Sequence, residues 1–250
     1  MSGVLIIAPL ALAATPTVAG TGAANLLTAD PNEAWIAPSL APVTIDIDMG
    51  AVVAVDSFCL AYTNADVAAS WWIEQGTGLG AGLSTIVPAA PMRAADSEGP
   101  RHHCFASLDA PVEARYFRIT VSQSGAAPLY VGALVIGLQF EKHRERGGGR
   151  TPVDTGSRQD LASGGFGTDD GVVKAQFAFS FIDLTDEETR RLWSIKRGRG
   201  LRKPIVVIEN ADLAAGFNEA FHYGVFERFQ PYEDVEADNV RWACSVVEWA

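Results

Sequence analysis

The sequence predicts a mainly β protein with a single helix, and three observations support this prediction. Short strand-like runs are separated by clusters of Gly, Pro, Asn and Asp. In several of these runs apolar and polar side chains alternate, as they do in a strand with one buried face. Only the segment 185–200 has the start and stop signals of a helix. The 250 residues are 48% hydrophobic, which is enough for one large domain or two ordinary ones.

The chain opens with an apolar segment, MSGVLIIAPLALAA, that has two interpretations. A secretory signal peptide is also apolar and ends in small residues, but it begins with positive charge, which this segment lacks. The other interpretation, which we favour, is a strand over residues 4–7 that belongs to the first domain. No other apolar run is long enough to span a bilayer, so we predict no membrane insertion.

We predict that residues 1–140 form one antiparallel β-sandwich. Residues 44–49 (TIDIDM) place apolar side chains on one face and acids on the other, and residues 116–121 (YFRITV) alternate in the same way. Residues 130–140 are a nearly continuous apolar run, long enough for one or two strands buried on both faces. The glycines of residues 76–82 precede no helix, so we interpret them as a hairpin tip and not as a phosphate-binding loop.

Residues 141–171 differ abruptly from what precedes them. The run EKHRERGGGR contains four basic residues, two acids, a histidine and three glycines. Consecutive glycines do not hold a helix, and loops of this length inside a compact domain are usually functional or disordered. We therefore predict a basic, Gly-rich linker or a long exposed arm over residues 141–171.

A second domain, predicted over residues 172–250, is β-structured with one helix. The run QFAFSF alternates as clearly as any strand in the chain. Thr185 and Glu188 have the spacing of a capping box, in which each side chain bonds the other's free backbone amide. Gly198 or Gly200 ends that helix. Further strands are predicted over residues 204–208, 225–229 and 240–249.

Three segments occur in an order that is typical of one family of β-sandwiches. They are residues 25–35 (NLLTADPNEAW), the strand at 44–49 and the run YFRI at 116–119. In the discoidin-like, galactose-binding-like jelly rolls, a loop N-L-L-D-x-D-P-x-T-x-W precedes a V-T-I-D-L-G strand, and a late R-Y-x-R-I strand returns to the sheet. Residues 20–138 resemble this family, with Thr28 and Glu33 in place of its aspartate and threonine. By analogy, the resemblance implies a lectin-like module that touches cell-surface glycans.

The order of the parts resembles a second group of proteins. A discoidin-like module, a basic glycine-rich connection and a strand–helix–strand domain ending in VRWACSVVEW are similar to the minor tail proteins of long-tailed bacteriophages (siphoviruses). The resemblance implies a tail-tip or baseplate component of the virion, assembled in the host cytoplasm. Its C-terminal domain would be similar to the tube-like domain of distal tail proteins, which forms a ring around the tail channel. The implied partners are copies of the chain and the neighbouring tube and hub proteins.

The charges are distributed unevenly along the chain. A net charge of −11 argues against binding nucleic acid, since that affinity comes mostly from Lys and Arg at phosphates. No Lys or Arg precedes Arg93, whereas 13 of the 19 lie between Lys142 and Lys203. Solvation of a helix end explains part of this density. The full density indicates contact with an acidic neighbouring subunit, with the lumen of a ring or with passing DNA, and we favour the acidic subunit. The predicted assembly residues are Arg144, Arg146, Arg150, Arg158, Arg190, Arg191, Arg197, Arg199, Arg202 and Lys203.

Candidate ligand-binding residues lie in two short segments. Trp71 and Trp72 are adjacent, so in a strand one joins the core while the other faces a partner or stacks on a sugar. Arg101 and His102 are the other candidates. Adjacent histidines rarely chelate one ion, and no HExxH pattern accompanies them, so we place His102 and His103 in an exposed loop.

Asp30 and Asn32 have two interpretations. The discoidin-like family often has a structural calcium ion near this loop, and both side chains offer oxygen ligands. The alternative is a turn in which the Asp30 side chain bonds backbone amides while Trp35 fills the core. We predict no other cofactor, and we interpret the three widely spaced cysteines as core thiols.

The predicted function is that of a non-enzymatic structural protein of a phage tail tip, with an outer domain that can contact glycans. One alternative is a host-surface carbohydrate-binding protein. A less favoured alternative is a secreted polysaccharide-active enzyme, because the sequence shows no nucleophile elbow, no nucleotide-binding motif and no assignable acid pair. No catalytic residue is therefore predicted.

Overall fold

The computed structural model describes residues 3–39, 42–94, 99, 101–123, 127–160, 162–210, 217–236 and 239–249. Within these residues the chain is built mainly of antiparallel strands, so the predicted mainly β class is confirmed. None of the helices found there has the length and apolarity that a membrane crossing requires. In chain order the elements are β1 (Val4–Pro9), η1 (Ala23–Leu27), β2 (Trp35–Ile36), β3 (Val43–Thr63), β4 (Ser70–Gly76), β5 (Ser84–Pro91), β6 (His102–Ser122), β7 (Tyr130–Lys142), β8 (Gly149–Asp154), β9 (Ser157–Asp160), β10 (Phe166–Asp169), β11 (Val173–Leu184), α1 (Asp186–Arg199), β12 (Ile205–Ile208), α2 (Phe217–Ala220), β13 (Phe221–Phe226), β14 (Glu233–Glu236) and β15 (Asn239–Glu248).

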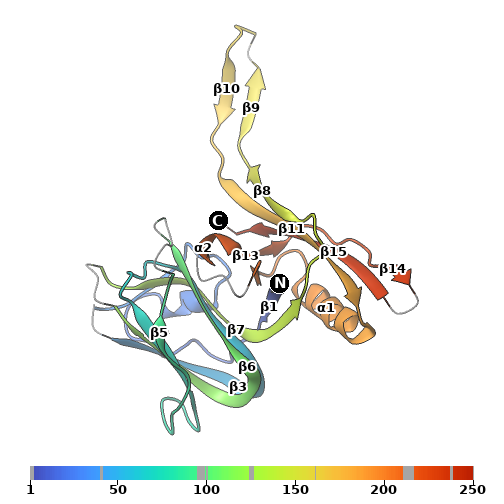
Figure 1. Cartoon of the computed structure of the whole chain (residues 1–250). Helices are drawn as coiled ribbons and strands as arrows, with labels where there is room; N and C mark the ends of the chain where they lie inside the picture. Colours follow the sequence, from blue (N-terminus) through green and yellow to red (C-terminus); the bar gives the residue numbers. More distant parts are fainter. Residues whose placement is uncertain are drawn as a thin grey trace.

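One sheet runs through both halves of the molecule. Its strand order is β5-β4-β6-β3-β7-β1-β12-β13-β15-β11-β8, with β2 paired to β7 and β14 paired to β15. The first five strands in this order belong to the N-terminal half, and the last five belong to the C-terminal half (Figure 1). β1 lies between the two sets.

The N-terminal half is a two-layered sandwich because its longest strands bend. β3 and β6 have 21 residues each, which is about 70 Å of extended chain. Their pairing shifts register between Asp48 and Val53, where Gly50 adopts a φ of 80°, a conformation that favours glycine. One end of the β3–β6 pair lies against β4, and the other end lies against β7. The core between the layers includes Trp35, Ile45, Phe58, Trp71, Phe117 and Ile136.

β1 belongs to both halves of the molecule. It pairs antiparallel with β7 on one edge and with β12 on the other. Ile6 packs into the C-terminal core, whereas Leu5 and Ile7 pack into a third cluster between the halves. The strand predicted at residues 4–7 is confirmed. Its assignment to the first domain alone is wrong, because β1 pairs with a strand of each half and its apolar side chains pack in clusters that include residues of the second half.

The C-terminal half follows the local signals of the sequence closely. Thr185 accepts a hydrogen bond from the backbone amide of Glu188, and the Glu188 side chain accepts one from the Thr185 amide, which confirms the capping box. Gly200, with φ 60°, follows the last turn. The buried side chains of α1 are Leu192 and Lys196, and the Lys196 ammonium lies 3.9 Å from the centroid of the Trp242 ring. The three phenylalanines predicted to alternate on β11 are buried in the same core.

Two predictions in this half are corrected by the structure. The strand expected at 225–229 is β13, which begins at Phe221 and ends at Phe226, because Phe221 to Gly224 pair with β12. Residues 227–229 are exposed and lie outside any strand. One helix was predicted in this half, but the structure also has a second, one-turn helix, α2. Its residue Asn218 accepts a hydrogen bond from the backbone amide of His103 on β6.

The segment 141–171 contains the strands β8, β9 and β10, and only its β9–β10 part projects from the molecule. β8 pairs with β11 and forms an edge of the sheet. β9 and β10 pair only with each other and form a hairpin that extends away from both halves (Figure 1). The side chain of Phe166 on this hairpin is 59% exposed, and the guanidinium of Arg158 lies 4.5 Å from its ring centroid. We call residues 157–169 the projecting hairpin.

Candidate functional site

The loop of residues 29–32 is held in place by both halves of the molecule. On the sandwich side, Gly132 of β7 lets the loop approach, because a Cβ atom there would lie 2.4 Å from the carbonyl oxygen of Pro31. From the other half, the hydroxyl of Tyr223 donates a hydrogen bond to the carbonyl of Ala29 at 3.0 Å. The loop is therefore fixed where the sandwich meets β13 and β15.

Arg101 is positioned beside this loop by three contacts. Its Nη2 donates to Asn32 Oδ1 at 3.1 Å, and its guanidinium lies 5.6 Å from the ring centroid of Tyr62. Its carbonyl accepts a hydrogen bond from the side chain of Asn218 at 3.1 Å. Tyr62, buried and with a φ of 54°, lies at a register shift near the end of β3. The strained backbone and the two hydrogen bonds together fix the cation at the surface.

Two hollows share Asn32 as a common wall, and we call them together the Asn32 groove. One has a volume of about 280 Å³ and the other of about 400 Å³. The smaller hollow is lined by Pro31, Asn32, Ala34, Ile36, Arg101 and Tyr130. The larger one is lined by Asp30, Asn32, Val153, Thr155, Lys174, Val225, Val247, Glu248 and Trp249.

The groove combines aromatic rings with groups that donate and accept hydrogen bonds. Trp249 and Tyr130 supply aromatic surface, Arg101 and Lys174 supply donors, and Asp30 supplies carboxylate oxygens. Aromatic faces suit apolar C–H surfaces, and planar charged side chains suit neighbouring hydroxyls. This mixture is chemically suited to a polyhydroxylated ligand.

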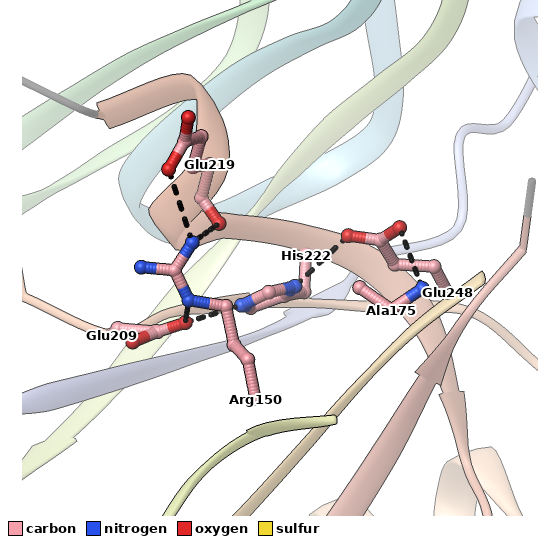
Figure 2. Close-up of polar contacts among 6 residues, drawn as sticks. All are labelled: Arg150, Ala175, Glu209, Glu219, His222 and Glu248. Atoms are coloured by element: carbon pink, nitrogen blue, oxygen red, sulfur yellow. Dashed lines mark hydrogen bonds and ion pairs between the residues drawn. The ribbon is translucent and has the colours of Figure 1, made fainter. Parts of the chain in front are cut away.

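Glu248, on one wall of the larger hollow, belongs to a buried polar network (Figure 2). Its Oε1 lies 2.9 Å from Nδ1 of His222, and its Oε2 accepts a hydrogen bond from the Ala175 amide at 3.3 Å. Nε2 of His222 lies 2.8 Å from Oε1 of Glu209, to which Arg150 also donates at 2.8 Å. His222 is 1% exposed, and the two carboxylates hold this network at the junction of β12, β13, β15 and β8.

The protonation of His222 follows from these neighbours. Burial by itself lowers the pKa of His222, but the hydrogen bonds and charges of Glu209 and Glu248 outweigh burial and raise that pKa above its ordinary value. The protonated imidazolium can donate to both carboxylates at once, whereas the neutral ring can donate to only one. We call Glu209, His222, Glu248 and Arg150 the His222 network.

The structure brings together only some of the predicted ligand-binding residues. Arg101 lies in the Asn32 groove, but Trp71 is 1% exposed and belongs to the sandwich core. Trp72, next to it on β4, is partly exposed and lines neither hollow. Trp71 therefore has no ring face for a ligand, and the expected division into one core and one outward tryptophan is observed.

The exposed loop predicted for His102 and His103 is wrong. Both residues begin β6 and are buried, His102 against the guanidinium of Arg93 and His103 stacked on Phe221 at 4.4 Å between centroids. Burial lowers the pKa of His103 to about 3, so that its ring is neutral. Phe221 of the second half and Tyr62 of β3, neither of which the local sequence reveals as a neighbour, cover this end of β6.

The turn interpretation of Asp30 and Asn32 is the one the structure displays. Oδ1 of Asp30 accepts hydrogen bonds from the backbone and side-chain nitrogens of Asn32 at 2.9 and 3.0 Å. Oδ1 of Asn32 faces the guanidinium of Arg101. In this arrangement a guanidinium faces one of the two side-chain oxygens that the calcium interpretation uses. Within the described residues no cluster of His, Cys, Asp or Glu could hold a metal ion, and all three cysteines are buried free thiols.

The predicted assembly residues divide into engaged and exposed side chains. Arg199 donates to the carbonyls of Pro9 and Pro204, Arg191 donates to Gln139, and Arg150 belongs to the His222 network. The guanidinium groups of Arg158 and Arg144 lie over the rings of Phe166 and Phe177. Arg190 donates a hydrogen bond to the carbonyl of Asp186 in its own helix. The exposed members without such contacts in the described part of the chain are Arg146, Arg197, Arg202 and Lys203.

Several groove residues could not be found from local sequence patterns. Tyr130, Lys174, Glu248 and Trp249 come from three strand segments far apart in the chain and meet only through the shared sheet. The local sequence does predict the Asp30–Pro31–Asn32 turn and names Arg101 as a candidate, but it gives no sign that the two lie side by side.

Comparison with known proteins gives similarities in structure only. No protein-family model and no curated protein matches the chain. Among solved structures, a chitosan-binding module of a chitosanase/glucanase from Paenibacillus sp. IK-5 is 16% identical, with a TM-score of 0.41, over 53% of this chain and 99% of that chain. A family 32 carbohydrate-binding module of Clostridium perfringens NanJ, solved with galactose, is 14% identical, with a TM-score of 0.40, over 54% and 99%. The corresponding module of AlyQ, solved with 4,5-unsaturated mannuronic acid, is 19% identical, with a TM-score of 0.41, over 51% and 96%.

Proposed function

We propose that the protein binds carbohydrate, without catalysis, in the Asn32 groove. The observation that carries this proposal is the convergence of Trp249, Asp30, Asn32 and Lys174 in one hollow beside the preorganised guanidinium of Arg101. A sugar ring can stack on an indole while its hydroxyls bond fixed carboxylate, amide and cationic groups. The groove lies at the junction of two packed units, where ligand sites often occur.

Glu248 acts as a fixed acceptor and not as a reactive group in this proposal. Both of its oxygens are engaged, one by His222 and the other by the amide of Ala175. One oxygen of Asp30, Oδ1, is held by the two hydrogen bonds of the turn that it forms with Asn32. A carboxylate that serves as general acid or nucleophile needs a free oxygen directed at the bond it breaks. The carboxylates of the groove are therefore suited to hold the hydroxyls of a bound sugar in place and not to react with it.

The test compares Trp249, which is partly exposed, with Trp193 on α1. We expect Trp249→Ala to weaken retention of the full chain on immobilised polysaccharides about tenfold or more, since it removes the stacking surface. Trp193→Ala is the matched control, because Trp193 is 53% exposed on α1 and lines neither hollow. Arg101→Ala is expected to weaken binding as well. Affinity electrophoresis over neutral and acidic polysaccharides measures both effects. Equal losses in both tryptophan variants, or no retention of the wild type on any polysaccharide, would refute the groove.

A second function, assembly into a larger particle, is favoured by the projecting hairpin. A two-stranded hairpin alone is marginally stable in water, yet β9 and β10 contribute no residue to the hydrophobic clusters of the described chain. Such an element suits contact with a neighbouring molecule. The proposal matches the resemblance to phage tail-tip proteins, in which copies form a ring in the virion beside tube and hub proteins.

Deletion of the projecting hairpin tests the assembly function. Replacing residues 157–169 with a short Gly-Ser turn keeps the bonds between Thr155 and Val172 at its base. We expect the free energy of unfolding to change by less than about 1 kcal/mol, because the hairpin buries little. We expect self-association, measured by sedimentation velocity, to be lost. A wild-type chain that stays monomeric at high concentration, or a deletion variant that associates equally well, would contradict this function.

A further inference from the structure

A cavity of about 550 Å³ lies beside the loop that precedes β8, apart from the Asn32 groove. Its wall is the loop of residues 143–148, which connects β7 to β8, and its opposite wall is the end of β12 at Glu209 and Asn210. We call it the 143–148 cavity. A volume of this size suits a small molecule.

The shape of the loop is fixed by its packing on β11. The amide of Glu145 donates to the carbonyl of Ser180 at 2.7 Å. Gly148 lies so close to β11 that a Cβ atom there would be 2.4 Å from the carbonyl oxygen of Ala178. Gly147, with φ 114°, also needs to be glycine. Glycine at positions 147 and 148 is therefore required to seat this loop against the strand.

The two carboxylates at the cavity are already neutralised from outside it. Glu145 forms an ion pair with Arg241 at 2.7 Å. Glu209 is bonded by Arg150 and His222, both at 2.8 Å (Figure 2). Neither carboxylate is left to balance the cations of the loop itself.

The cations of the loop have no such compensation. Arg144 has its guanidinium 5.4 Å from the ring centroid of Phe177, an uncharged partner. Arg146 is exposed and forms no ion pair within the described part of the chain. His143 adds an imidazole that can donate a hydrogen bond. The cavity is thus a local positive site in a protein whose net charge is −11.

We propose that the 143–148 cavity binds a small polyanion, with Arg144 and Arg146 as the groups that hold its oxyanions. Guanidinium groups bind carboxylate and phosphate through paired hydrogen bonds, and the fixed loop holds these cations on one wall of a single cavity. The shared chemistry of the ligand is two or more oxyanions on one small molecule, and the probes separate carboxylate from phosphate. This site goes beyond the proposed carbohydrate binding and does not depend on it.

The experiment is titration calorimetry of the full chain with citrate and, separately, with pyrophosphate at low salt. We expect at least one probe to bind, and we expect Arg146→Glu to weaken that binding about tenfold or more. Arg146→Gln, which removes the charge without reversing it, should weaken it less. Tighter binding of citrate identifies a carboxylate ligand, and tighter binding of pyrophosphate identifies a phosphate ligand.

The matched control is Arg197→Glu, an equal change of charge at an exposed position of α1. It should leave the affinity within about twofold of the wild type. Binding that weakens equally in Arg146→Glu and Arg197→Glu would show a diffuse surface effect and overturn the proposal. Absence of binding of both probes at millimolar concentration would overturn it as well. Polysaccharide retention should be unchanged in Arg146→Glu, which separates this site from the Asn32 groove.

Discussion

Ile6→Asp is expected to unfold the entire molecule and not only one half of it. Ile6 is fully buried, and its strand pairs with β7 of the sandwich and with β12 of the other half. A buried carboxylate without a partner costs several kcal/mol, which is comparable to the total stability of a typical domain. The milder Ile6→Ala is expected to reduce the free energy of unfolding by about 2–5 kcal/mol.

The measurement is differential scanning calorimetry of Ile6→Ala beside Ala14→Asp, a change at an exposed position shortly after β1. Because β1 is shared, we expect one cooperative transition, shifted to lower temperature in Ile6→Ala and unchanged in Ala14→Asp. Two transitions, of which Ile6→Ala shifts only one, would show that the halves unfold independently.

The second large effect is expected at His222. His222→Ala leaves Glu209 and Glu248 facing an empty space, and removing one partner of a buried charged network costs roughly 3–5 kcal/mol. His143→Ala is the matched control, since His143 is exposed and lies outside the network. Chemical denaturation monitored by circular dichroism gives both free energies of unfolding. A loss below about 1 kcal/mol at pH 6 would contradict the charged network.

The stabilisation from His222 also has a defined dependence on pH. Its pKa in the folded protein is raised above the ordinary value of 6.5, so the folded state binds the proton more tightly than the unfolded state does. The contribution is therefore complete below about pH 6.5 and is lost as pH rises through the folded pKa. The stability difference between wild type and His222→Gln should shrink over that range, and a difference that grows would show the opposite sign.

Sequence patterns predicted those parts of the fold that short-range physics determines. The capping box at Thr185, the alternation in β11 and the hairpin tip between β4 and β5 each depend on neighbours within a few residues. The acids on the outer face of β3 were also predicted, but their partners were not. Asp46 binds Arg118 through two hydrogen bonds of 2.6 and 2.8 Å, across 72 positions of sequence. That pairing depends on register, which alternation leaves open.

The site was harder to predict than the fold because its residues meet across the junction. Trp249 and Lys174 approach Asn32 only because β1 joins the sandwich to the second half. His102 and His103 illustrate the same limit, since the rings that bury His103 come from β13 and β3. The residues that precede these histidines in the sequence are polar and include a proline, which is the pattern of a loop.

The shared strand β1 has a mechanical consequence. Backbone hydrogen bonds run without interruption from β5 at one edge of the sheet to β8 at the other. The two halves are therefore joined by paired strands and not by a flexible tether, and the angle between them is set by the twist of this sheet. If the Asn32 groove binds a saccharide, the ligand would therefore be held at a constant orientation to both halves of the molecule.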